Sequence, residues 1–70
     1  MKCILAIDQG TTGSRAVLYD KNARRIATAY EEFPQHFPRP SWVEHDPEDI
    51  WQSVNRSIQK TIRRAPGAEI

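Results

Sequence analysis

Blocks of apolar residues separated by polar turns predict three strands followed by one helix. The run Cys3–Ile7 is continuous and apolar, and we expect a strand at about residues 2–8. Further strands are expected at about residues 14–19 and 25–33. Because their connections are short, the three strands should form an antiparallel meander.

The first strand has no alternation of apolar and polar residues, which is typical of a central strand covered on both faces. The single helix can cover only one face of the sheet. We therefore expect the other face to be covered by residues outside this sequence, and Ala68–Ile70 to lead into another strand. The 70 residues are interpreted as an N-terminal piece of a larger domain.

A helix is predicted from about residue 47 to residue 64. Asp46 can cap its free N–H groups, Pro47 suits the first helical position, and Ala65-Pro66-Gly67 ends it. Five apolar residues recur at helical spacing and predict the stripe that faces the sheet: Ile50, Trp51, Val54, Ile58 and Ile62.

Residues 34–41 contain three prolines and predict an irregular, extended connection. We expect Trp42 and Val43 to pack beneath neighbouring residues. Two tryptophans near a proline-rich stretch also suggest a small proline-recognition module, but Trp51 falls within the helix stripe and is interpreted as core.

Composition and charge exclude several classes of protein. Ten Lys and Arg against nine Asp and Glu leave a net charge of +1, too little for a nucleic-acid or anionic-membrane surface. The longest apolar run is far shorter than the roughly 20 residues that span a bilayer. The single cysteine, Cys3, forms no intrachain disulfide and lies in an apolar strand where a thiolate is disfavoured. With no secretory signal pattern, a cytoplasmic location is expected.

The stretch Asp8–Arg15 carries the candidate chemistry. A carboxylate at the end of a buried strand suits Mg²⁺, glycines let backbone N–H groups approach phosphate, and Arg15 offers a planar cationic fork. The hydroxyl groups of Thr11, Thr12 and Ser14 add donors. On spacing alone, a simple glycine-containing hairpin loop remains an alternative, since the P-loop pattern is absent. His45 beside Asp46 suggests either an acid–base pair or a neighbour of the helix cap.

Two motifs carry a family resemblance. Ile7–Val17 resembles the first phosphate-loop motif of the glycerol kinase branch of the FGGY carbohydrate kinases. Trp42–Pro47, followed by Ile50-Trp51, is similar to that branch's second N-terminal signature. The resemblance implies an α/β, ribonuclease H-like (actin-like ATPase) fold, of which residues 1–70 form the β-β-β-α portion of the first lobe.

The resemblance also implies roles for individual residues. Asp8 would hold Mg²⁺ through water, and Arg15 would be a catalytic cation near the transferred phosphoryl group. The phosphates of ATP would be contacted by Thr11, Thr12 and Gly13, and more weakly by Gly10 and Ser14. The sequence departs from the family pattern at Gly13, where glycerol kinases have serine, and at Ser41, where glycine is usual.

The implied activity is ATP-dependent phosphorylation of a polyol, glycerol to glycerol 3-phosphate, by a full-length homo-oligomeric enzyme without nucleic-acid or membrane partners. In this family the substrate-holding residues and the general base lie beyond residue 70, so the piece alone should be inactive. Alternatives are an FGGY kinase for a pentulose or hexulose, and an actin-like nucleotide-binding protein that is not a kinase. Gln9 and Thr11-Thr12 favour glycerol, and the second motif disfavours the non-kinase.

Overall fold

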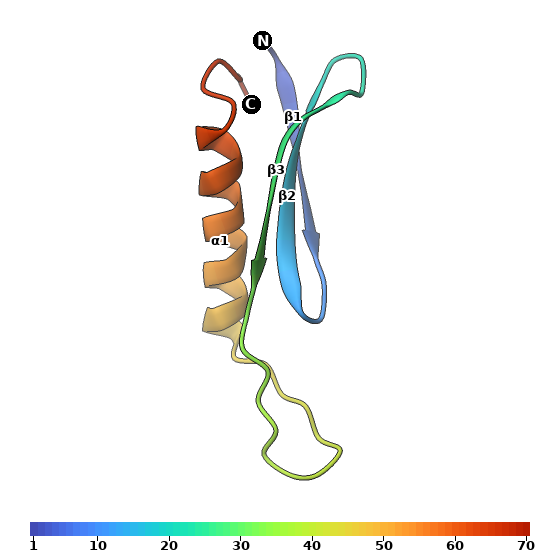
Figure 1. Ribbon diagram of the computed structural model, residues 1–70, viewed down its shortest axis with the longest axis vertical. Coiled ribbons are helices and arrows are strands. Elements are labelled where there is room, and N and C mark those ends of the chain that lie inside the picture. Colours follow the sequence, from blue (N-terminus) through green and yellow to red (C-terminus); the bar gives the residue numbers. More distant parts are fainter.

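The computed structural model describes all 70 residues as a three-stranded sheet with one helix packed on it (Figure 1). The elements are β1 (Cys3–Gln9), β2 (Gly13–Asp20), β3 (Arg25–Glu32) and α1 (Pro47–Arg63). The strands pair antiparallel in the order β1-β2-β3, which is the expected meander. Each element begins and ends within one residue of its expected bounds. The helix is neither long nor apolar enough to cross a membrane.

β1 is an edge strand in this sheet, and the expectation of a central strand covered on both faces is wrong for the residues present. β2 occupies the centre, and α1 covers mainly β2 and β3. Ile4 on β1 is opposite Tyr19 and lies on the face of the sheet away from α1, where it is 69% exposed. The apolar run Cys3–Ile7 indicates that β1 has apolar surface on both of its faces. The two hairpin connections nevertheless place β2, and not β1, in the middle of the sheet that these residues form.

The free edge of β1 is occupied only near its start. Lys2 and Glu69 form a parallel bridge, in which the Cys3 N–H donates to the Glu69 carbonyl at 2.7 Å. The Glu69 N–H in turn donates to the Met1 carbonyl at 2.7 Å. The two ends of the chain consequently lie side by side (Figure 1).

The most deeply buried residues of α1 carry hydroxyl groups, and the predicted apolar stripe is wrong in part. Ser53, Ser57 and Thr61 are fully buried, whereas Trp51 is 59% exposed and Ile62 is also exposed. Small side chains let the helix approach the strands closely. Their hydroxyls are satisfied locally, since Ser57 donates to the Val54 carbonyl at 2.8 Å and Thr61 to the Ser57 carbonyl at 2.7 Å.

A small cluster of buried hydrophobic residues lies at the end of the sheet where the chain termini meet. It comprises Cys3, Leu18, Ala27 and Ala65, with Leu5 and Ala68 packed against it. At the opposite end, Asp46 caps α1 as expected, its carboxylate accepting the Glu48 N–H at 2.9 Å. This cap fixes the start of α1 near the end of the sheet that carries the β1–β2 loop.

The β3–α1 connection, residues 33–46, extends beyond the sheet as a long loop (Figure 1). An antiparallel bridge between His36 and Glu44 closes its base. Trp42 and Val43 directly precede the bridge residue Glu44 and are more than half exposed, so the expectation that they pack beneath neighbours is wrong. Ser41 has φ 68°, the left-handed region that favours glycine, which explains why serine is a departure at this position.

Candidate phosphate-binding site

Residues 10–13, which comprise the β1–β2 loop and the first residue of β2, have all four of their backbone carbonyls bonded within the chain. Their donors, in chain order, are the Gln9 side-chain amide at 2.9 Å, the Gln35 side-chain amide at 3.0 Å, the Phe33 N–H at 3.2 Å and the Gly10 N–H at 2.9 Å. By contrast, the N–H groups of Thr11 and Thr12 donate to no group of the chain. The loop thus offers two free N–H donors, and each of its carbonyls already accepts a hydrogen bond, an arrangement that suits an anion.

Gly13 is needed for the close approach of β3. A Cβ at this position would lie 2.5 Å from the Tyr30 hydroxyl oxygen and 2.6 Å from the Glu31 carbonyl oxygen. Because the second of these atoms is backbone, a side chain at position 13 would force β2 and β3 apart. This close contact favours glycine at position 13 in this chain.

Asp8, Arg15 and Tyr30 form one row across the sheet beside the loop. Asp8 is opposite Arg15 in the β1–β2 register, and Arg15 is opposite Tyr30 in the β2–β3 register. Directly opposed residues share a face of the sheet. Asp8 and Arg15 are exposed and form no ion pair with each other, so a carboxylate and a guanidinium are both free to meet a ligand on this face.

Tyr30 is a member of the site that the sequence did not reveal. Its hydroxyl lies 3.0 Å from Thr12 Oγ1, and its ring lies 5.1 Å from the Arg15 guanidinium carbon. The aromatic face thereby supports Arg15 by a cation–π contact. In the sequence Tyr30 appears only as one apolar position of a strand, and its place opposite Arg15 follows from the register.

The structure does not bring the Ser14 hydroxyl to the site, so its expected role as a side-chain donor is wrong. Ser14 is fully buried, and its Oγ lies 2.8 Å from Ser53 Oγ beneath α1. Neighbouring residues of a strand point to opposite faces of the sheet. Ser14 therefore faces α1, whereas Arg15 faces away from it. Thr11 remains with a free hydroxyl at the loop.

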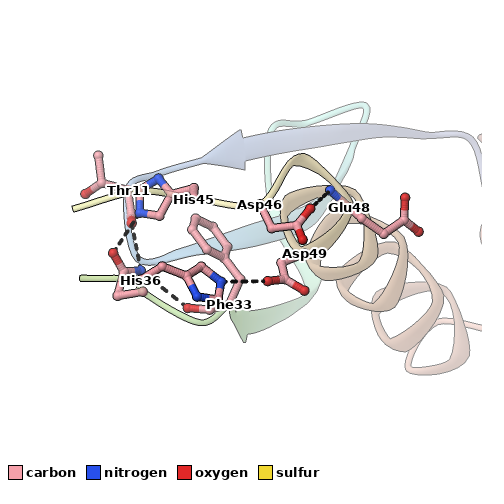
Figure 2. Close-up of polar contacts among 8 residues, drawn as sticks. Thr11, Phe33, His36, His45, Asp46, Glu48 and Asp49 are labelled. Carbon is pink, nitrogen blue, oxygen red and sulfur yellow. Dashed lines mark hydrogen bonds and ion pairs between the residues drawn. The ribbon is translucent and has the colours of Figure 1, made fainter. Parts of the chain in front are cut away.

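The β3–α1 connection reaches the β1–β2 loop through Gln35, and Figure 2 shows His45 of the same connection near this contact. His45 Nε2 lies 2.7 Å from Gln35 Oε1, and the Gln35 amide nitrogen donates to the Thr11 carbonyl. His45 makes no pair with Asp46, whose carboxylate points to the start of α1. The alternative of a His45–Asp46 acid–base pair is therefore not supported by the geometry.

Comparison with known protein families and curated proteins gives concordant matches. A model of the FGGY family of carbohydrate kinases, N-terminal domain, matches residues 3–70. A glycerol kinase from Alkalilimnicola ehrlichii is 54% identical over 65 residues, and one from Chelativorans sp. is 56% identical over 62 residues. These matches cover 93% and 89% of this chain, but only 13% and 12% of the relatives.

Two solved structures share the fold. Plasmodium falciparum glycerol kinase, crystallised with ADP, superposes on the whole chain with a TM-score of 0.91 and 26% identity, over 15% of its own length. A xyloylose kinase from Brucella ovis superposes on 91% of the chain with a TM-score of 0.86 and 28% identity, over 13% of its own length. The expected α/β, actin-like ATPase fold class is confirmed.

Proposed function

Because this chain belongs to the FGGY family of carbohydrate kinases, we propose that the full-length protein phosphorylates a polyol with ATP, converting glycerol to glycerol 3-phosphate. The chain spans about 13% of the curated relatives it matches, so this activity is that of a longer protein. One observation supports the proposal most directly: the β1–β2 loop has every carbonyl occupied and two N–H groups free.

In this proposal the loop binds the phosphates of ATP. The Thr11 and Thr12 N–H groups donate to phosphate oxygens, and the free Thr11 hydroxyl adds a third donor. Gly13 and Gly10 contribute backbone alone, which lets the phosphates approach closely. Ser14 takes part only through its backbone, because its side chain is held beneath α1.

Asp8 is the proposed residue for Mg²⁺. Its carboxylate is exposed and forms no ion pair, and it lies on the strand that leads into the loop. This fits Mg²⁺, which prefers one or two carboxylates, keeps several waters and binds phosphate oxygens. The ion would neutralise charge on the phosphates when bound. Asp8 itself would hold the ion's water shell at the rim of the site.

Arg15 is the proposed catalytic residue. Its guanidinium lies on the same face as Asp8 and is supported by the Tyr30 ring. A planar cation aimed at the transferring phosphoryl group stabilises the charge that develops in the transition state. Arg15 therefore acts on the rate of phosphoryl transfer rather than on nucleotide binding alone.

The substrate is the least constrained part of the proposal, since a pentulose or hexulose kinase would use the same loop. The curated relatives reported above are glycerol kinases, which favours glycerol. A coupled ADP-release assay on the full-length protein with glycerol, xylulose, ribulose, gluconate and no acceptor decides between them. We expect the highest kcat/KM with glycerol. A pentulose preference would contradict the substrate, and ATP hydrolysis indifferent to every acceptor would contradict the kinase.

We propose further that the full-length enzyme is a homo-oligomer in the cytoplasm, where ATP and a small polyol are both available. Sedimentation of the purified full-length protein at several concentrations checks the oligomeric state. A monomer at all concentrations would contradict it without affecting the proposed reaction.

A further inference from the structure

The β3–α1 connection contacts the β1–β2 loop at the Thr11 carbonyl, which belongs to the same peptide as the free Thr12 N–H. The Gln35 side-chain amide donates to the Thr11 carbonyl at 3.0 Å and also approaches the Phe33 carbonyl at 3.3 Å. The Thr11 carbonyl and the Thr12 N–H belong to one planar trans peptide and point in opposite directions. Holding the carbonyl on the Gln35 side therefore turns the Thr12 N–H toward the open side of the loop.

His45 determines which way the Gln35 amide faces. Gln35 Oε1 can only accept a hydrogen bond, so His45 Nε2, at 2.7 Å, carries the proton and donates. Turning the amide by half a rotation would place its NH₂ group against this donor and its oxygen against the Thr11 carbonyl. His45 is itself held by an edge-on contact with the Phe33 ring, 5.0 Å between ring centroids and 83° between planes (Figure 2).

We propose that Gln35 and His45 are positioning residues that hold the Thr11–Thr12 peptide in its anion-binding orientation. The inference rests on the proposed function for its consequence, nucleotide binding, but its geometric content concerns the loop alone. The proposal gives the second sequence motif, Trp42–Pro47, which contains His45, a physical role in shaping the first motif, Ile7–Val17. Neither residue touches the reacting atoms.

Losing Gln35 removes the donor to the Thr11 carbonyl, and losing His45 leaves the Gln35 amide free to turn away from that carbonyl. The peptide is then free to turn its carbonyl toward the phosphates, where it repels them and withdraws the Thr12 N–H. Nucleotide affinity should fall because the loop must be reordered on binding. Glycerol binding should not change, since the Thr11–Thr12 peptide is proposed to contact the nucleotide and not glycerol.

The test compares full-length wild-type protein with Gln35→Met and His45→Leu. We expect the Kd for ADP and the KM for ATP to rise about fivefold to tenfold in both, as for the loss of one hydrogen bond. The KM for glycerol should stay within about twofold. His45→Gln restores a donor to Gln35 and should recover most of the affinity.

His36→Ala is the matched control. His36 lies in the same connection and bonds to Asp49 at 3.3 Å, not to the loop, so its removal should leave ADP affinity unchanged. Amide exchange of the ligand-free protein supplies a readout independent of nucleotide: exchange at residues 10–13 should quicken in Gln35→Met and His45→Leu only.

Two results would overturn the inference. The first is unchanged exchange and unchanged ADP affinity in Gln35→Met or in a folded His45→Leu. The second is an equal effect of His36→Ala, which would indicate general loosening of the connection. If wild-type protein fails to bind ADP while the exchange differences appear, the positioning role stands and the proposed function fails.

Discussion

The proposed binding of an anion by the β1–β2 loop depends on which partners the individual backbone groups have. Four carbonyls are bonded to donors from three parts of the chain: the loop itself with Gln9, the end of β3 at Phe33, and Gln35. The two free N–H groups and the exposed Arg15 are then the complementary set for a phosphate. A charge of only +1 over the whole chain is no obstacle, because the local donors provide the recognition.

At this scale the sharpest prediction concerns Arg15. Arg15→Ala in the full-length protein should lower kcat and kcat/KM for ATP together, by about 100-fold or more, because the guanidinium acts mainly in the transition state. Arg15→Lys keeps the charge but loses the planar fork, and should recover only part of the rate. Steady-state kinetics at saturating glycerol measures both. A rise in KM for ATP alone would mean that Arg15 only anchors the nucleotide.

The sequence predicts Asp8, Thr11, Thr12 and Arg15 as site residues because their types and order form a motif. The motif could not distinguish Ser14, since strand alternation places its hydroxyl under the helix. Tyr30 and Gln35 lie 15 and 24 residues from their partners Arg15 and Thr11. Such pairs depend on strand register and on the path of the connection, which local patterns do not contain.

Close packing of α1 on β2 and β3 is the main feature at the scale of elements. The serine and threonine face of the helix lies against a sheet surface that includes Ala16 and Ala29, both buried. Small residues on both sides bring the two layers together. Thr61 even reaches the Ala16 carbonyl, at 3.3 Å, while it also donates to its own helix.

Position 57 tests this packing. Ser57→Leu should overfill the space between helix and sheet and destabilise the fold by about 1–3 kcal/mol. Ser57→Ala, the matched control, should be close to neutral because the lost bond is to the Val54 carbonyl of the same helix. Thermal unfolding of the full-length variants measures the difference. Equal melting temperatures for the two variants would show that the helix has room at this face.

The order and bounds of the elements were predictable, because turn residues and the helix cap are local signals. The packed face of α1 was not. Hydropathy counts serine and threonine as polar, so the pattern selected Trp51 and Ile62, which are exposed. Close helix–sheet approach favours small side chains whatever their polarity, provided that their hydroxyls are bonded.

Over the whole molecule, the exposed apolar residues occur on both outer surfaces. Ile4 lies on β1, Trp51 and Ile62 lie on α1, and Trp42 lies in the β3–α1 connection. Burying such side chains would contribute about 25 cal/mol for each Å² of apolar area. The chain matches only about 13% of its curated relatives, so a full-length protein would supply both the cover and the second part of the active site.

The central claim is that the row beginning at Asp8, beside the β1–β2 loop, serves phosphoryl transfer. It is tested most directly by the kcat of full-length Asp8→Asn with saturating ATP, Mg²⁺ and glycerol. Asparagine keeps the size of the side chain and removes its charge at an exposed position, so the fold and melting temperature should be unchanged. Without the carboxylate that positions Mg²⁺, kcat should fall by about 100-fold or more. A folded Asp8→Asn protein with near wild-type kcat would contradict the claim.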